Sequence, residues 1–289
     1  MEIKKAVITA AGKGQRSLAL QTFVDRDGTQ KPALVIIIEE VVEAGVDELC
    51  VIVHPGDVEV YRSAAGRYAS RISFVEQTSP LGYGHAVYCA REFVNKNPFL
   101  LLVSDHLYIS SINKRCAHQL VEIASTKNCS VSAVQSTYES KLPYFGAIGG
   151  RRIPNCIPNC EGLYEVSTVI EKPTPTDAEQ YLIIPGLRSG YYLCFFGMHV
   201  LTPSVMDLLK EEIDRCGEKG GVQLSSALAR LPLFEKYLAY EVKGKRYDIG
   251  GKYGILNAQL AIALSGKNRD EVLCNLVELL ATKISQQSD

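Results

Sequence analysis

The chain has 289 residues, of which 46% are hydrophobic and 22% charged, and its formal net charge at pH 7 is -1. These values are typical of a globular protein with one large core, and the scattered lysines and arginines provide no basic field that would bind nucleic acid. No apolar run reaches the length of a membrane span, so we expect a cytoplasmic protein with no membrane partner.

Strand-like and helix-like segments alternate along the first half of the chain. The local patterns predict strands at 6–9, 48–53, 72–75, 99–103 and 130–134, and helices at 33–44, 58–65, 84–93 and 113–125. This alternation predicts an α/β fold with a Rossmann-like, mostly parallel sheet flanked by helices. Ligands of such folds bind at the carboxyl ends of the strands.

The second half is richer in turn residues. After residue 135 proline and glycine separate shorter segments, with strands expected at 164–170, 191–196 and 238–242 and helices at 203–215, 222–231, 251–264 and 269–283. We therefore expect a single domain over 1–289. Its first half is about 1–135, and its second half, about 136–289, is mixed α+β with C-terminal helices.

Nine cysteines are spread through the predicted strands and helices, as is usual for small buried residues in a reducing compartment. Only Cys156 and Cys160 lie close together. A zinc site at this pair lacks a second pair of ligands nearby, so two free thiols in a loop are the favoured interpretation and zinc is the alternative.

A glycine-bearing stretch at 10–16, Ala-Ala-Gly-Lys-Gly-Gln-Arg, follows the first predicted strand. Glycines at this position let the backbone approach a phosphate so that N–H groups point at its oxygens, and a basic side chain adds charge. The stretch does not match the Walker sequence, and Ser17 stands where the dinucleotide pattern has its third glycine. Taken alone, it fits a phosphate-binding loop or a plain glycine turn.

Two further stretches follow predicted strands of the first half. Gln77 precedes a turn that contains Gly82. One interpretation is that the amide side chain and the exposed backbone of the turn recognise the edge of a base, and the alternative is that Gln77 only caps the next helix. Asp105 follows the strand at 99–103. That is a usual position for a magnesium-binding carboxylate and also for a helix cap.

Two more stretches belong to the second half. Glu171 and Lys172 lie at a strand end, where the acid would bind sugar hydroxyls and the ammonium a phosphate, or where both form an exposed charged pair before a turn. Asp248 stands at a strand-to-helix junction followed by glycines. It is either a second metal ligand or another helix cap.

In this order, the stretches resemble those of the sugar-1-phosphate nucleotidyltransferases, most closely the bacterial UTP:glucose-1-phosphate uridylyltransferases, from about Lys5 to Ala263. The matching sequences include Tyr144-Phe145-Gly146 and the Glu-Lys-Pro that begins at Glu171. The resemblance assigns each stretch a role. It implies triphosphate binding by Ala10, Ala11, Gly12, Gly14 and Arg16, uracil recognition by Gln77 and Gly82, magnesium binding by Asp105 and Asp248, and sugar-phosphate binding by Gly146, Glu171 and Lys172.

The chain departs from the family pattern around the glycine loop. Gln15 replaces the usual threonine, and neither the proline expected after Arg16 nor a clear counterpart of the family's catalytic lysine is found. We expect Arg26 to supply the missing positive charge, although a guanidinium is a planar fork and an ammonium a point charge. Lys31 with the following proline resembles the family's later Lys-Pro. Gln223 keeps a family glutamine, but the acid that usually precedes it is lost.

The resemblance implies a nucleotidyltransferase that joins a sugar 1-phosphate, expected to be glucose 1-phosphate, to UTP and releases pyrophosphate. The implied catalytic groups align two anions and neutralise charge, with Mg²⁺ as cofactor and Arg16, Arg26, Asp105 and Lys172 as protein groups. A dTTP-using thymidylyltransferase and a non-catalytic sensor on the same fold remain open. A nicotinamide dehydrogenase is disfavoured because His54 stands near the position of its ribose-binding acid. We expect small-molecule substrates as partners and a homo-oligomer.

Overall fold

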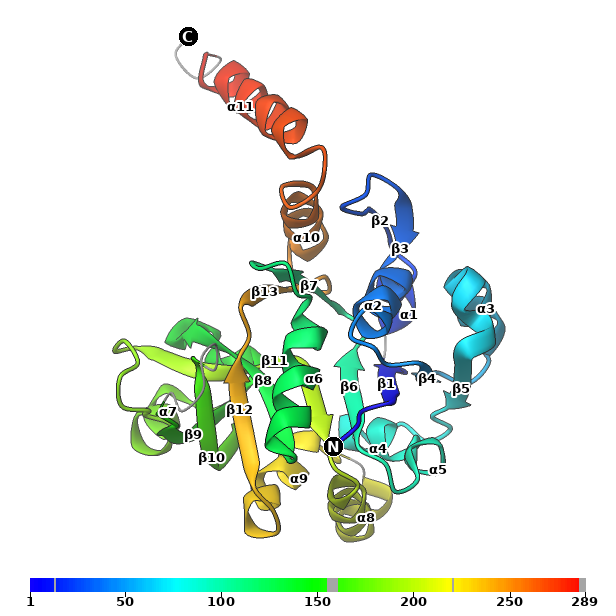
Figure 1. Ribbon diagram of the computed structural model, residues 1–289, viewed down its shortest axis with the longest axis vertical. Helices are drawn as coiled ribbons and strands as arrows, with labels where there is room; N and C mark the ends of the chain where they lie inside the picture. The colour runs from blue at the N-terminus through cyan, green and yellow to red at the C-terminus, as the bar shows by residue number, and fades with distance from the viewer. Residues whose placement is uncertain (13, 155–160, 220, 286–289) are drawn as a thin grey trace.

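The structure is a computed structural model and describes residues 1–12, 14–154, 161–219 and 221–285. A nine-stranded sheet with the spatial order β5-β4-β1-β6-β11-β8-β12-β10-β9 runs through the body (Figure 1). Its strands, in chain order, are β1 (Lys5–Ala10), β4 (Glu48–Val53), β5 (Ile72–Glu76), β6 (Phe99–Val103), β8 (Ser130–Tyr138), β9 (Gly146–Arg152), β10 (Leu163–Glu171), β11 (Tyr191–Leu201) and β12 (Tyr237–Glu241). Both halves of the sequence contribute strands to this sheet, as expected for a single domain. The single domain over 1–289 and its two halves stay a prediction.

The first four strands of this order form the parallel half that the sequence predicts. β5, β4, β1 and β6 pair in parallel, and Val7 of β1 lies opposite Cys50 on one side and Leu101 on the other. The expected bounds agree with the structure at β4 and β6 and differ by one residue at both ends of β1 and at the C-terminal end of β5. The α/β fold with a Rossmann-like parallel half is confirmed.

Beyond β6 the sheet is mixed, as the turn-rich second half predicts. β11 lies between β6 and β8 and is antiparallel to both. β12 is parallel to β8, and β10 and β9 follow with antiparallel pairing. The sequence does not predict the insertion of β11, because β8 precedes it along the chain and local patterns carry no information on such pairing.

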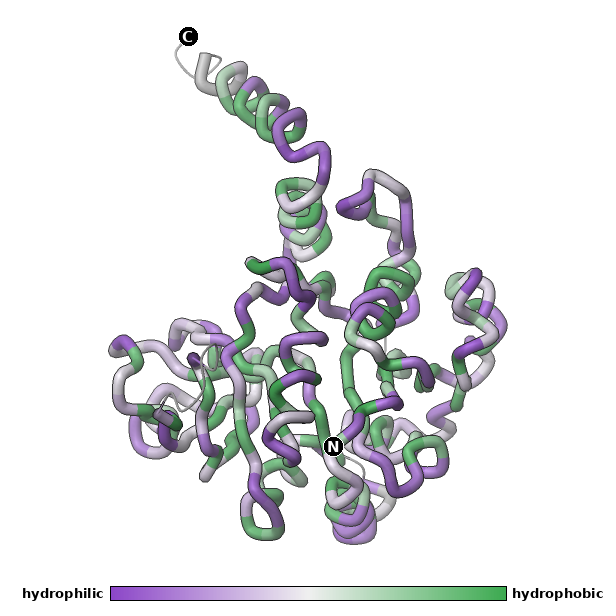
Figure 2. Tube along the Cα trace, in the orientation of Figure 1, coloured by the Kyte–Doolittle hydropathy of each residue, from purple (hydrophilic) through white to green (hydrophobic). Residues whose placement is uncertain are grey.

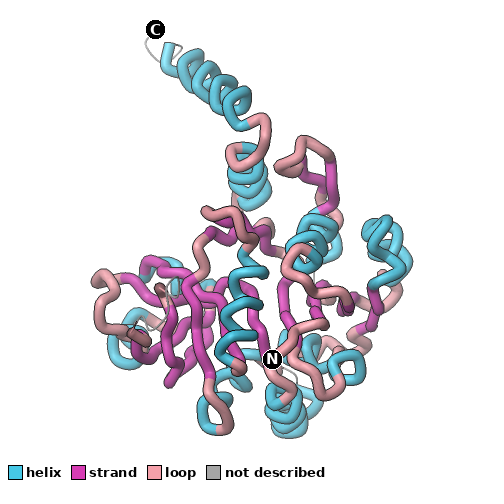
Figure 3. Tube along the Cα trace, viewed as in Figure 1, coloured by secondary structure: helices cyan, strands magenta, loops and turns pink. Residues whose placement is uncertain are grey.

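Helices cover both faces of the sheet, and strands occupy the middle of the body (Figure 3). The helix expected at 84–93 is two short helices, because the chain turns between Tyr88 and Arg91. The helices are α1 (Gln15–Ala19), α2 (Ala33–Val42), α3 (Val58–Ala65), α4 (Tyr83–Tyr88), α5 (Arg91–Val94), α6 (Cys116–Lys127), α7 (Pro175–Tyr181), α8 (Ser204–Cys216), α9 (Leu224–Arg230), α10 (Gly254–Ala263) and α11 (Arg269–Ser285), with 3-10 helices η1 (Gly66–Arg71), η2 (Glu139–Tyr144), η3 (Gly217–Lys219) and η4 (Leu231–Leu233).

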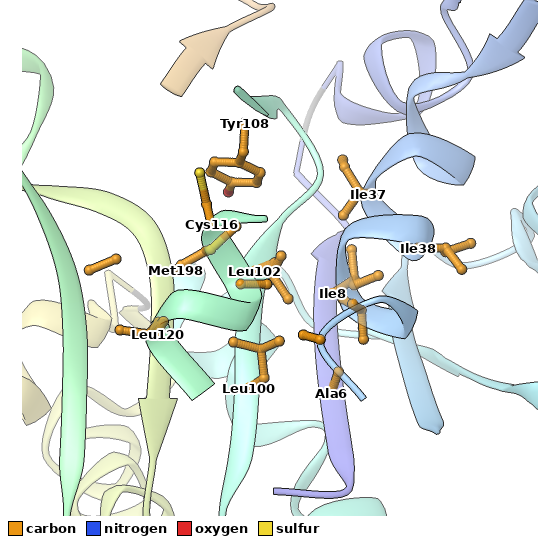
Figure 4. Packing of buried hydrophobic residues seen from close by; sticks show 14 of the residues in the cluster. Ala6, Ile8, Ile37, Ile38, Leu100, Leu102, Tyr108, Cys116, Leu120 and Met198 are labelled. Carbon is orange, nitrogen blue, oxygen red and sulfur yellow. The ribbon is translucent and has the colours of Figure 1, made fainter. Parts of the chain in front are cut away.

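Two cores lie on the two faces of the sheet because successive side chains of a strand point to opposite sides. In β1, Ala6 and Ile8 belong to the core under α2 and α6, whereas Val7 belongs to the core under α4, α8 and α9. Figure 4 shows the first core, in which Ile8 lies among side chains of the sheet and of α2. This double packing holds the carboxyl ends of the parallel strands in place.

Two small antiparallel ribbons lie at the carboxyl end of the parallel strands and were not predicted. β7 (His106–Ser110) pairs with β13 (Gly244–Asp248), and β2 (Thr22–Val24) pairs with β3 (Gln30–Pro32). Each strand has only three to five residues, too few for a clear alternation of polar and apolar positions. β7 follows β6 in the chain and β13 precedes α10, so the ribbon places the segment after β6 beside the segment that leads into α10 (Figure 1).

The last two helices form an extension of the body. α10 stands beside the β7–β13 ribbon, and α11 extends away from it with the C-terminus at the far end (Figure 1). Hydrophobic positions recur along α11 (Figure 2), and Leu273, Val277 and Leu280 are 45%, 58% and 62% exposed. None of the described helices combines the length and apolar character of a membrane span.

Candidate active site

Asp105 and Asp248, 143 positions apart in the sequence, are brought together by the β7–β13 ribbon. Asp105 directly precedes β7, and Asp248, the last residue of β13, lies opposite His106 in the ladder. The backbone N–H of Ile249 donates to the carbonyl oxygen of Asp105 at 2.9 Å. Neither acid caps a helix: Asp105 is followed by a strand, and Tyr253 is the N-cap residue of α10. The helix-cap interpretation of both residues is therefore excluded.

Asp105 is held as a carboxylate by its two neighbours. Its oxygens lie 2.7 Å from His106 Nδ1 and 3.2 Å from Gln15 Nε2, and its side chain is 28% exposed. Burial raises the pKa of Asp105, but the hydrogen bonds from His106 and Gln15 outweigh burial and lower it below the usual value. Asp248 is more exposed and accepts a 2.9 Å hydrogen bond from the backbone N–H of Gly250.

The glycine loop lies next to Asp105, joined to it through Gln15. Gln15 Oε1 accepts a 2.8 Å hydrogen bond from the backbone N–H of Gly12 while its amide nitrogen reaches Asp105. Gly14 has a φ of 81°, which glycine adopts at little cost, and precedes α1. Arg16 Nη1 lies 2.9 Å from the carboxylate of Asp57, a buried residue before α3. Lys13 of the loop lies outside the described residues.

The predicted base-reading residues occur at the end of β5 and the start of α4. Gln77 is 8% exposed, and its Nε2 lies 3.1 Å from the carbonyl oxygen of Gly82 and 3.0 Å from His85 Nδ1. Burial lowers the pKa of His85, which favours the neutral ring that accepts this bond. Gly82, and not Gln77, is the N-cap of α4. A close backbone contact with Val222 holds the turn, because Gly84 N donates to Val222 O at 2.9 Å.

Gly146 and Glu171 lie opposite each other in the β9–β10 ladder. A Cβ on Gly146 would lie 2.9 Å from Glu171 Oε2 and 2.8 Å from the Phe195 ring, so glycine leaves room for the carboxylate. Both residues line a cavity of about 170 Å³ that also includes Tyr83 and His106. Next to Asp105 the structure therefore has a small pocket with one acid and several apolar walls.

Lys172 directly follows β10 and has a φ of 47°, a left-handed backbone conformation that a lysine seldom adopts. Its backbone N–H donates to Phe145 O at 3.2 Å, which holds this turn beside Gly146. Strain of this kind persists where the surroundings impose it, commonly at functional sites. The Lys172 side chain is exposed.

Arg26 forms no hydrogen bond or ion pair with Asp105, Asp248 or the glycine loop among the described residues. It lies in the turn between β2 and β3, where Arg26 Nη2 donates to the carbonyl oxygen of Tyr108 at 3.1 Å and Lys267 N donates to Arg26 O. Lys31 of the same ribbon is bound to three acids, with Asp25 Oδ2 at 2.7 Å and Glu39 Oε2 at 2.8 Å. No contact among the described residues supports the expected catalytic role of Arg26.

The sequence reasoning did not assign roles to three residues of the site. His106 orients Asp105, Gln15 joins the loop to Asp105, and Val222 holds the turn at Gly82. A signal existed for Gln15, because it replaces the family threonine. His106 and Val222 act through pairings with distant segments, which the sequence does not reveal.

The carboxylate oxygens of Asp105 and Asp248 fit Mg²⁺, which is commonly held by one or two carboxylates together with substrate phosphates. The partial exposure of Asp105 leaves room for such a ligand at its side. Among the described residues, no group of three histidines, cysteines or acids is arranged to hold a metal ion by protein ligands alone. The donor set therefore suits a cation that substrates share.

The chain is similar over most of its length to proteins of known function. The chain is 28% identical to UTP–glucose-1-phosphate uridylyltransferase 1 of Streptococcus pyogenes, over 96% of this chain and 94% of that protein. It is also 28% identical to the Bacillus subtilis UTP–glucose-1-phosphate uridylyltransferase, over 98% of each.

A solved structure of UDP-glucose pyrophosphorylase in complex with UDP-glucose is similar, with a TM-score of 0.74 and 25% identity over 90% of this chain and 98% of that one. A UTP-bound UGPase from Acinetobacter baumannii has the same fold, with a TM-score of 0.73 and 24% identity over 96% of this chain and 99% of that one. The sequence pattern of the nucleotidyl transferase family matches residues 5–264. With most of its length matched and the two carboxylates placed beside the glycine loop, the chain belongs to the nucleotidyl transferase family.

Proposed function

We propose that this enzyme transfers a uridylyl group from UTP to glucose 1-phosphate, giving UDP-glucose and pyrophosphate. The observation that carries the proposal is the position of Asp105 and Asp248 between the glycine loop and the pocket of Glu171. The names of the relatives from Streptococcus pyogenes and Bacillus subtilis support the choice of both substrates.

In the proposed reaction, a phosphate oxygen of the sugar phosphate attacks the α-phosphorus of UTP in line, and the bond to pyrophosphate breaks. The attacking phosphate is already ionised at neutral pH, so no general base is required. Catalysis consists of aligning two anions that repel each other and neutralising their charge. A bound Mg²⁺ would supply such charge neutralisation, with Asp105 and Asp248 holding it.

The chain's own residues divide the substrates between two regions. The backbone of the glycine loop and Arg16 bind the triphosphate, and Gln77 with the Gly82 turn reads the base. Glu171 accepts hydrogen bonds from sugar hydroxyls in the pocket beside Gly146, and Lys172 binds the sugar phosphate. Arg26 stays a proposed source of positive charge, because its bond to the carbonyl oxygen of Tyr108 involves only Nη2 of a guanidinium that has five N–H donors.

The proposed assembly is a homo-oligomer, and the exposed apolar side chains of α11 support it.

A cytoplasmic location is likewise a proposal. The free cysteines of the described residues, such as Cys50 and Cys116, support it because secreted proteins commonly pair such residues in disulfides.

The test is pyrophosphate release by the purified protein with glucose 1-phosphate, Mg²⁺ and each of UTP, dTTP, ATP and GTP. We expect turnover with UTP and its loss in Asp105→Asn and Asp248→Asn, because asparagine keeps the shape but loses the charge that holds a cation. Asp177→Asn is the matched control, since Asp177 belongs to the capping box of α7. This control should lose stability but keep activity.

Retained activity in both Asp105→Asn and Asp248→Asn would overturn the metal site. No pyrophosphate release by the wild-type protein with any of the four triphosphates would favour the non-catalytic sensor. Equal turnover of ATP and UTP would overturn the role of Gln77. A buried partner left without its hydrogen bond costs about 1–3 kcal/mol, or roughly ten- to a hundredfold in rate. Preferred use of dTTP would identify the thymidylyltransferase instead.

A further inference from the structure

A second cavity, of about 480 Å³, lies between η2, β13 and the start of α10. It shares Tyr144 and Phe145 with the smaller pocket of Glu171, and Asp248 lies on its wall. The remaining walls come from Gln135 and Thr137 of β8 and from the first turn of α10. The cavity therefore adjoins the proposed transfer site but is built largely from residues to which the proposed reaction assigns no role.

The cavity is electropositive. Lys141, Arg246 and Lys252 line it, and Asp248 is the one acid among its described lining residues, so three formal positive charges face one negative charge. None of these three cations forms an ion pair with a carboxylate in the part of the chain that the structure describes. By contrast, Arg16 is paired with Asp57 and Arg115 with Glu43.

Arg246 is the deepest of the three cations. Its guanidinium lies over the Phe145 ring, 3.8 Å from the ring centroid, and this contact fixes the plane of the group. Its Nη1 is buried with no hydrogen-bond partner among the described residues. A buried guanidinium nitrogen left unpaired is costly, and an anion close to the group would offset that cost by electrostatic attraction.

The start of α10 adds partial positive charge to the same wall. The N-cap residue, Tyr253, has a φ of 61° and provides no side-chain cap, and Gly254 at the first turn lines the cavity. The first N–H groups of a helix attract anions. Gln135, Thr137 and Asn257 supply neutral polar groups in the same cavity, and such groups orient a bound ligand.

We propose that this cavity is a binding site for a phosphoryl-bearing anion, next to the transfer site and separate from it. A guanidinium held flat by an aromatic ring and two lysines is the donor set that suits phosphate oxygens. Inorganic phosphate, pyrophosphate and a sugar phosphate share this chemistry. The proposal does not depend on turnover and goes beyond the proposed function.

The experiment is calorimetric titration of the full chain with inorganic phosphate, pyrophosphate or glucose 1-phosphate, in EDTA and without UTP. We expect at least one of the three anions to bind, and its affinity should decrease at higher salt. The anion that binds most tightly indicates which of the three the cavity is suited to. Lys141→Gln and Lys252→Gln should each weaken it by about three- to tenfold, because each removes a partly exposed charged contact. Lys245→Gln is the matched control, since Lys245 is exposed on β13 and does not line the cavity.

Arg246→Lys tests the planar fork, because it keeps the charge but not the guanidinium geometry. We expect the anion to bind this variant more weakly. If Arg246→Lys fails to fold, Lys141→Gln and Lys252→Gln test whether the cavity binds the anion. Lys172→Gln separates the two sites: it should impair use of glucose 1-phosphate in the transfer assay but leave the binding of inorganic phosphate unchanged. Loss of binding in Lys172→Gln alone, or no binding of any of the three anions, would overturn the proposal without touching the proposed function.

Discussion

His199 of β11 is a buried histidine within a chain of hydrogen bonds between three strands. Its Nδ1 lies 2.6 Å from Ser132 Oγ of β8, which lies 2.5 Å from Tyr237 OH of β12. Burial lowers the pKa of His199 to about 3. The ring is therefore neutral in the folded protein in mild acid and at neutral pH.

We predict that His199 makes the fold less stable in mild acid. The unfolded chain binds a proton at this histidine below pH 6.5 and the folded chain does not, so the free energy of unfolding falls as the pH drops below 6.5. Between pH 7.5 and 5.5 this loss is about 1.4 kcal/mol. Urea unfolding of wild type and His199→Gln at both pH values measures it.

His199→Gln can keep the bond to Ser132 but has no group that titrates in this range. Its free energy of unfolding should therefore depend less on pH than that of wild type. His85, whose pKa is also lowered by burial, is present in both proteins and contributes equally. An identical pH dependence in the two proteins would contradict the prediction.

Gln15 shows what one substitution relative to a family pattern does in this chain. Its side chain occupies the inside of the glycine loop, between Gly12 N and Asp105. A threonine is too short to make both contacts from the same position. The departure noted in the sequence thus has a structural role, as a link between the loop and the proposed metal ligand.

At the level of elements, the base-reading turn depends on one glycine. Gly82 has a φ of 122°, and a Cβ there would lie 2.5 Å from Val222 O. We predict that Gly82→Ala separates the turn from Val222, raises the KM for UTP and lowers the free energy of unfolding. Steady-state kinetics and urea unfolding measure the two effects.

Gly45→Ala is the control for backbone strain alone. Gly45 has a φ of 81° after α2, and a Cβ there meets nothing within 4 Å. This variant should lose about 1–2 kcal/mol of stability from the left-handed backbone and keep its KM for UTP. If Gly82→Ala behaves like Gly45→Ala, the contact with Val222 has no role in nucleotide binding.

At the level of the whole molecule, α11 extends away from the body, and its side chains Leu273, Val277 and Leu280 are exposed. Exposed apolar side chains of this number on one helix are commonly covered by a partner. We predict that light scattering after size exclusion gives a mass above the 31.7 kDa of one chain. In the double variant Leu273→Glu, Leu280→Glu, the measured mass should decrease toward that of one chain.

The control for this prediction is Glu271→Ala, which changes charge on α11 but no apolar side chain. It should keep the mass of wild type, and the paired glutamate variant should still fold because α11 contributes none of the buried residues of the two cores. A wild-type mass of one chain would contradict the homo-oligomer.

The sequence by itself determined the parallel half of the sheet and its order of strands and helices. Apolar runs such as 48–53 and 99–103 are buried on both sides, so their local pattern is strong enough to identify strands. The position of Asp105 at a strand end followed directly. The family resemblance then identified the stretches around Gln77, Glu171 and Asp248.

Only the tertiary structure decided how these stretches meet. The β7–β13 ribbon, the insertion of β11 between β6 and β8, and the contact of Gly82 with Val222 are pairings between segments far apart in the chain. Local propensity carries no information on such pairings, because their stability comes from hydrogen bonds and packing with a partner strand. The contact of the Arg26 guanidinium with the carbonyl oxygen of Tyr108 is another such pairing, and the expected catalytic role of Arg26 stays a prediction.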